Sequence, residues 1–148
     1  MNIVIKRIAR ILSMLILLYA AGCRVVLVPE YNQDLDKQII NTEKLNDQLY
    51  LELLALPQDQ RTYDSCKKKY LEIELQINSI MFQNKSRKQN TDMIAILQTL
   101  KKKFLEYEEE HKKGKVLSDG MLQAYEADIM AAWQPLLTAE QALKKIKP

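Results

Sequence analysis

Apolar side chains recur at intervals of three and four residues along most of this sequence, and this period constrains the fold more than any other feature. Such a period places the apolar residues on one face of an α-helix. The chain also has only 3 glycines and 4 prolines among its 148 residues, which favours uninterrupted helices. We therefore predict an all-α fold. The pattern divides into four helical segments, at about residues 34–56, 62–84, 91–113 and 118–145.

Short connections join these segments, which predicts an antiparallel bundle of four helices in one domain, residues 34–148. The connection at 84–91 is entirely polar and fits either a reversal of the chain or a kink. With a kink, the domain has three helices, one of them long and bent. Ser118 is a suitable N-cap for the last helix. Pro135 lies inside that helix and is expected to kink or restart it near Trp133.

The chain opens with a basic stretch that contains Lys6, Arg7 and Arg10. An uncharged and mostly aliphatic run follows, at residues 11–22. A basic start followed by a short apolar run is typical of a secretory signal peptide. The run is shorter than the roughly 20 apolar residues that a membrane-spanning helix needs. We therefore predict that residues 1–22 are a secretion signal.

The end of this segment, Ala20-Ala21-Gly22-Cys23, resembles the lipobox of bacterial lipoproteins. In that family the cysteine thiol receives diacylglycerol, a peptidase cuts before the cysteine, and the new amine is acylated. The resemblance covers the first 23 residues. It implies cleavage after Gly22 and a lipid-modified Cys23, so that residues 23–33 become a lipidated tether to the membrane. The lipid on Cys23 is the only non-protein group that we expect.

The residue after the cysteine carries a further implication of this resemblance. Aspartate at that position tends to retain such lipoproteins at the inner membrane, whereas this chain has Arg24. The resemblance therefore favours the periplasmic face of the outer membrane over the inner membrane. The mature chain also resembles other small helical lipoproteins of the cell envelope.

The charge balance gives no reason to expect a nucleic-acid partner. The whole chain has a formal net charge of +3, but the three basic residues of the signal leave with it. The mature chain then carries equal numbers of basic and acidic side chains. Its composition therefore has no excess of basic residues that would favour binding of a polyanion.

We expect no catalytic or metal-binding residues. The single histidine, His111, lies in the charged run EEEHKKGK and is predicted to be a solvent-exposed residue near a helix end. No His-His or Cys-His metal pair is expected within the chain. The sequence contains no phosphate-binding glycine loop and no nucleophile motif. We therefore predict that the protein is not an enzyme.

Cys66 is the one cysteine left once Cys23 carries lipid. It falls on the apolar face of its helix, which predicts a buried thiol that packs as a small apolar group. The lysines at 67–69 leave an alternative open, because they would lower the pKa of an exposed thiol and favour a mixed disulfide or a covalent dimer.

Aromatic residues near a proline suggest a groove for a partner. The candidate groove residues are Asn46, Tyr70, Tyr125, Trp133 and Pro135. Core packing is the default for the aromatic side chains, and partial exposure at the edge of the apolar face is the default for Asn46. The leading functional hypothesis is a lipid-anchored, non-enzymatic structural or interaction module that docks an envelope protein. The alternative is a small-ligand module that binds a lipid or cell-wall fragment between its helices.

Overall fold

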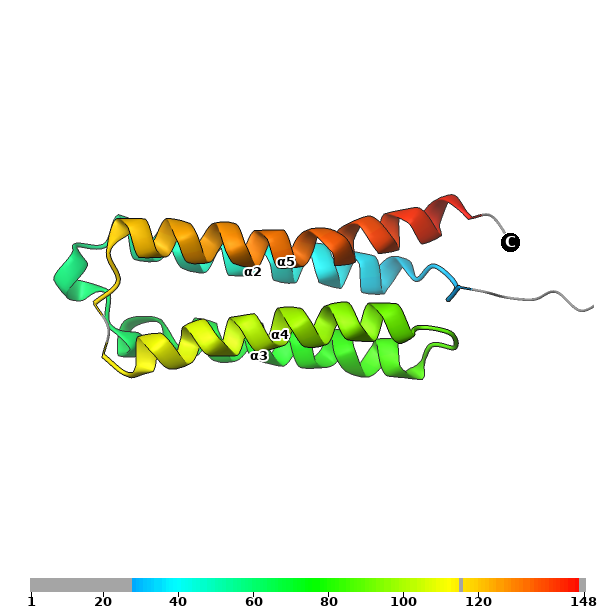
Figure 1. The fold of residues 1–148 in the computed structure, drawn as a ribbon, viewed down its shortest axis with the longest axis horizontal. Coiled ribbons are helices and arrows are strands. Elements are labelled where there is room, and N and C mark those ends of the chain that lie inside the picture. The colour runs from blue at the N-terminus through cyan, green and yellow to red at the C-terminus, as the bar shows by residue number, and fades with distance from the viewer. Residues whose placement is uncertain (1–27, 115, 147–148) are drawn as a thin grey trace, which may run out of the picture.

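The computed structural model describes residues 28–114 and 116–146. Over these residues the chain forms an antiparallel bundle of four long helices (Figure 1). This confirms the predicted all-α four-helix fold. The helices are α2 (Gln33–Ala55), α3 (Tyr63–Ser86), α4 (Thr91–Lys112) and α5 (Asp119–Lys145), with a short 3-10 helix, η1 (Gln58–Gln60), between α2 and α3.

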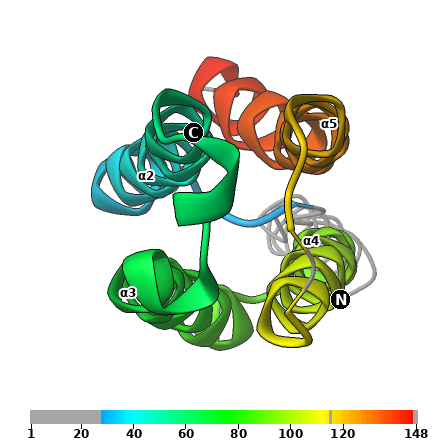
Figure 2. The same ribbon diagram turned by 90° about the vertical axis from the view of Figure 1, so that its left-hand side faces the viewer.

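Each helix packs against two neighbours, so that the four form a square in cross-section (Figure 2). α2 contacts α3 and α5, and α4 contacts the same two helices. α3 and α5 therefore occupy opposite corners. Apolar side chains from all four helices fill the centre, and the largest of those that are fully buried are Trp133, Tyr50, Tyr70 and Phe104. Burying such side chains removes much apolar surface from water, which is the main stabilising contribution to a fold of this kind.

The polar connection after α3 is a full reversal of the chain, so the arrangement with three helices and one long bent helix is excluded. α3 ends at Ser86, and α4 begins at Thr91 in the opposite direction. Gln89 has a φ of 53° in this turn, a left-handed conformation that closes a tight reversal. At the other end of the bundle, Gly114 follows α4 with a φ of 77°, which glycine adopts without steric cost.

Local capping explains where two of the helices begin. The Asn32 side chain accepts hydrogen bonds from the main-chain amides of Asp34, at 3.0 Å, and Leu35, at 3.1 Å. Ser118 caps α5 as predicted, because its hydroxyl oxygen accepts a hydrogen bond from the amide of Met121 at 3.3 Å. These bonds satisfy amides that have no partner within the helix itself.

α5 is continuous through Pro135, so the helix does not restart near Trp133. Its last turns are inclined away from the axis of its first turns (Figure 1), as expected where a proline removes one main-chain hydrogen bond. Among the helices of the described ranges, none has both the length and the apolar character needed to cross a membrane.

Candidate functional site

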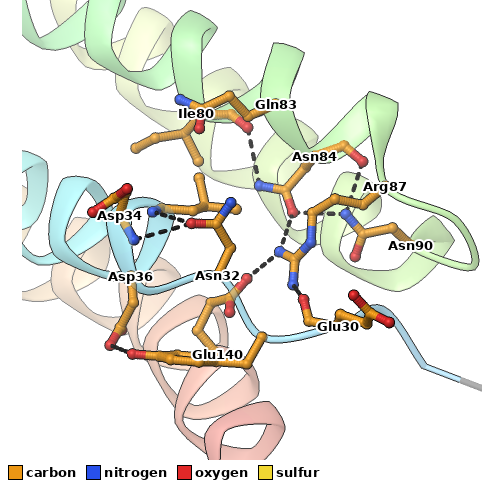
Figure 3. A network of polar contacts seen from close by, with 12 residues as sticks. Glu30, Asn32, Asp34, Asp36, Ile80, Gln83, Asn84, Arg87, Asn90 and Glu140 are labelled. Atoms are coloured by element: carbon orange, nitrogen blue, oxygen red, sulfur yellow. Dashed lines mark hydrogen bonds and ion pairs between the residues drawn. The ribbon is translucent and has the colours of Figure 1, made fainter.

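Buried polar side chains gather at the two ends of the bundle. The first group lies where residues 30–32 join the fold, and we call it the tether cluster (Figure 3). Its members are Asn84, Arg87, Asn90, Glu140 and the main-chain carbonyl of Glu30. The second group lies at the opposite end, and we call it the distal cluster. Its members are Arg61, Tyr63, Cys66, Tyr70, Glu108 and His111.

Arg87 is the centre of the tether cluster. One of its terminal nitrogens, Nη1, donates to Asn84 Oδ1 at 3.0 Å and forms a short ion pair with Glu140 Oε1. The other, Nη2, donates to the carbonyl of Glu30 at 2.6 Å. Because Arg87 follows α3 and Glu140 belongs to α5, one guanidinium connects two helices and the incoming chain.

The ion pair in this cluster is removed from water. The Glu140 side chain is 0% exposed and that of Arg87 is 12% exposed. A carboxylate buried to this degree requires a cation and hydrogen bonds to offset the loss of its hydration. Asn84 and Asn90 extend the network, since Asn90 Nδ2 donates to Asn84 Oδ1 at 2.6 Å. The cluster therefore fixes the turn between α3 and α4 against α5.

The side chain of Tyr31 also holds the chain before α2 at the end of the bundle that contains the tether cluster. Tyr31 Oη donates to Asp36 Oδ2 at 2.8 Å, and the ammonium group of Lys144 lies 5.9 Å from the centre of the Tyr31 ring. Residues 30–32 are thus attached to both α2 and α5. Cys23, Gly22 and the first residues of the predicted tether lie outside the described residues.

The distal cluster ties the connection between α2 and α3 to the start of α5. Arg61 is 6% exposed. Its guanidinium donates to the carbonyls of Leu54, Leu56 and Leu117 and pairs with Asp119 at 2.6 Å. α2 has no basic residue in its last turn, so Arg61 supplies the cation that the carbonyl end of that helix favours.

The prediction that His111 is solvent-exposed is wrong, because the side chain is 1% exposed. His111 lies seven residues after Phe104, on the buried stripe of α4, and the connection after η1 covers it. Its Nε2 lies 3.0 Å from the Arg61 carbonyl, and its Nδ1 lies 3.2 Å from Tyr70 Oη. A carbonyl can only accept, so Nε2 carries the proton and Nδ1 accepts from Tyr70. Burial lowers the pKa of His111.

Cys66 and His111, of which no metal pair was expected, come into contact in the distal cluster. Cys66 Sγ lies 3.9 Å from His111 Nδ1, although the two residues are 45 positions apart. Burial raises the pKa of the Cys66 thiol to about 11, so the lysines at 67–69 do not activate it. Cys66 is half-buried and packs against the core. A neutral thiol beside a neutral imidazole is not a nucleophile at pH 7.

Glu108 completes the distal cluster, and it is only 4% exposed although it belongs to the charged run around His111. Tyr63 Oη donates to its carboxylate at 2.9 Å, and Lys112 pairs with it at 3.0 Å. Within the described part of the chain, no group of three or more His, Cys, Asp or Glu side chains is placed to hold a metal ion.

The structure does not bring the five predicted groove residues together at one surface. Tyr70 and Trp133 are fully buried, as the default interpretation of core packing required. Tyr125 is half-buried, and its ring stacks on that of Tyr107 at 4.1 Å between centroids. Pro135 lines a groove. This groove runs between α4 and α5, has a volume of about 390 Å³, and is lined by Ala95, Ile96, Thr99, Lys103, Asp128, Ala131, Ala132 and Pro135.

Asn46 was expected to be partly exposed, and this was wrong because it is 0% exposed. It lies at the same spacing as the leucines of α2, in the centre of the bundle. Neither polar atom of its side chain has a hydrogen-bond partner among the described residues. The same holds for Tyr50 Oη and Trp133 Nε1, which also belong to the α2 and α5 side of the core. These three side chains leave unused hydrogen-bonding capacity inside the bundle.

Comparison with protein-family models, curated proteins and solved structures finds no match to this chain.

Proposed function

We propose that this protein is a lipid-anchored helical module of the bacterial cell envelope, attached through Cys23 and facing the periplasm from the outer membrane. One observation carries the proposal furthest. Residues 30–32, which follow the predicted anchor, are bonded to the bundle through the Glu30 carbonyl and Tyr31. A lipoprotein of this kind would hold a folded body at a short and defined distance from its membrane.

The proposed role is structural or interactive and not enzymatic. In each buried cluster the polar side chains bond to one another and to main-chain carbonyls. Arg61, for example, donates to the carbonyls of Leu54, Leu56 and Leu117. The Cys66 and His111 pair is neutral, because burial raises one pKa and lowers the other. These features support a role for the polar residues in holding the bundle.

The proposed partner is another envelope protein that docks in the groove between α4 and α5. Ala95, Ala131 and Ala132 leave room there for an approaching apolar side chain, and Pro135 forms part of the wall. Lys103 and Asp128 form an ion pair of 2.5 Å at the same groove. A partner helix with apolar residues at spacings of three and four would fit such a surface.

Metabolic labelling with an alkyne-bearing palmitate tests the anchor. We expect label on the wild-type chain and none on Cys23→Ala, with Cys66→Ala as the matched control that keeps its label. In membrane fractionation, the labelled proteins should be recovered with the membranes, and the unlabelled Cys23→Ala protein should not. An unlabelled wild-type chain recovered as a free periplasmic protein would remove the basis of the proposal.

A second candidate function, binding of a small lipid or cell-wall fragment between the helices, is favoured by one observation. Asn46 buries two polar atoms without a partner among the described residues, and Tyr50 and Trp133 bury one each. Such atoms are costly unless something bonds to them. Mass spectrometry of solvent extracts from protein purified out of membranes tests this candidate. It requires a bound molecule in the wild type that is lost from Asn46→Leu. Empty extracts from both proteins would exclude it.

A further inference from the structure

The outward face of α3 carries an unusual row of exposed apolar side chains. Leu71 is 56% exposed, Leu75 is 59% exposed and Phe82 is 76% exposed. Their spacings of four and seven residues place all three on one line along the helix. That line points away from the core, because the buried residues of α3, including Ile73, Ile77 and Ile80, occupy the opposite side. We call this row the α3 stripe.

The α3 stripe ends beside the point where residues 30–32 join the fold. Phe82 lies in the last two turns of α3, and Arg87, directly after that helix, bonds the Glu30 carbonyl. Glu30 lies seven positions after Cys23. Even fully extended, this stretch reaches no more than about 25 Å. A lipid on Cys23 would therefore keep the C-terminal end of α3 within that distance of the bilayer.

Cations flank the stripe and suit a phospholipid surface. Lys68 lies beside Leu71, while Lys85 and Lys88 follow Phe82, and all three are exposed. None of them forms an ion pair with a carboxylate in the part of the chain that the structure describes. Lysine stems lie along apolar surface while their ammonium groups reach lipid phosphates. Two exposed acidic residues border the row, Glu72 and Asp64, and Asp64 is paired with Lys67.

We propose that the α3 stripe lies on the phospholipid headgroup region of the membrane that carries the anchor, so that the bundle rests on α3. This inference depends on the proposed lipid anchor and specifies how the anchored domain is oriented. An interfacial helix buries its apolar side chains at the boundary between headgroups and acyl chains. With α3 against the bilayer, α5 at the opposite corner of the square faces away from it (Figure 2). The groove that α5 shares with α4 then stays open to a partner.

Site-specific photo-crosslinking of the full-length, palmitate-labelled protein tests this orientation. A benzophenone amino acid replaces Leu75 in one protein and Leu51 in the control. Leu51 is a good match, since it is 53% exposed and lies on the outward face of α2. Each protein is purified with its lipid, reconstituted into vesicles of phosphatidylethanolamine and phosphatidylglycerol, irradiated, and examined by mass spectrometry for phospholipid adducts. Circular dichroism confirms that both proteins retain their helices.

We expect several times more phospholipid adduct from position 75 than from position 51. Equal yields at the two positions on labelled protein would overturn the inference and leave the lipid anchor standing. Adducts from position 75 to a second copy of the chain would overturn it as well, because the stripe would then be a dimer interface. Absence of palmitate label on the starting protein would overturn both the anchor and the orientation.

Discussion

Arg87 and Glu140 form a buried ion pair at the end of the bundle where residues 30–32 join it. The Glu140 carboxylate is fully buried, and Arg87 is the cation that faces it. Their charges stabilise the fold only while both are present, since an isolated charge in this environment has neither water nor a partner. Arg87 also bonds Asn84 and the Glu30 carbonyl, so its loss would affect three segments together.

Replacing Glu140 with alanine should therefore be severely destabilising. We expect Glu140→Ala to lower the free energy of unfolding by about 3–5 kcal/mol, because Arg87 is left without its buried partner. The exposed pair of Lys102 and Glu106, at 3.8 Å, provides the control. Lys102→Ala should cost less than about 1 kcal/mol. Urea unfolding followed by circular dichroism measures both values, and similar costs for the two variants would contradict this account of the tether cluster.

His111 should make the stability of the bundle depend on pH. Burial lowers its pKa below the ordinary value of 6.5, so the unfolded chain takes up a proton at a higher pH than the folded chain does. The free energy of unfolding should therefore be greatest above about pH 6.5 and should fall as the pH drops below that value.

Thermal unfolding at about one pH unit on either side of 6.5 tests this dependence. We expect the melting temperature to fall on acidification by more in the wild type than in His111→Gln, which cannot take up the proton. Glu43 and Glu126 have raised pKa values, so acidification strengthens their contribution to stability. This opposite effect should be equal in both proteins. An identical acid shift in the variant would show that His111 is not responsible.

The buried polar residues were the hardest part of the structure to predict from sequence. Glu140 and His111 lie at the right helical spacing to be buried, at four residues after Leu136 and seven after Phe104. Their polarity nevertheless favours exposure when each helix is considered alone. Their partners are distant in sequence, since Arg87 and Glu140 are 53 positions apart. Only the packing of whole helices brings such pairs together.

At the level of elements, the start of α5 depends on a specific cap. Ser118 accepts a hydrogen bond from the Met121 amide, so Ser118→Ala should lower the free energy of unfolding by about 1 kcal/mol. Thr62 occupies the equivalent position before α3 but makes no side-chain capping bond. Thr62→Ala should therefore cost less than about 0.5 kcal/mol. Urea unfolding compares the two, and an equal loss in both variants would count against the cap.

Pro135 is expected to lower the stability of the helix that contains it. It lies inside α5 at an exposed position, where proline is about 3 kcal/mol less favourable than alanine in a fully regular helix. Water can bond the carbonyl that the proline leaves without a donor, so we expect a smaller gain. Pro135→Ala should raise the free energy of unfolding by about 1–2 kcal/mol. A loss of stability on urea unfolding would mean that the bend of α5 is required for packing.

The helices themselves were well predicted because their signals are local. The apolar period predicted the four helical segments. Their ends were predicted from Pro57, from the polar turn before Thr91 and from the cap at Ser118. The observed helices α2 and α5 begin within one residue of the predicted segments. The groove residues could not be grouped in this way. Tyr70 and Trp133 both face the core, and the sequence does not reveal that they lie at different levels of it.

At the scale of the whole molecule, the two polar clusters give the bundle two different ends. The tether cluster holds residues 30–32 against the turn between α3 and α4 (Figure 3). The distal cluster closes the opposite end around Arg61 and His111. With 27 residues, α5 is about 40 Å long. An anchor at Cys23 would act on one end of this body and define which part of it lies near the membrane.

The mass of the N-terminal peptide of the protein isolated from bacterial membranes tests the central claim most directly. We predict a peptide that begins at Cys23 and carries diacylglycerol on its sulfur and an acyl chain on its amine. The same preparation of Cys23→Ala should lack this species. A wild-type chain that still begins at residue 1, or one that begins elsewhere without lipid, would contradict the account of this protein as a lipid-anchored bundle.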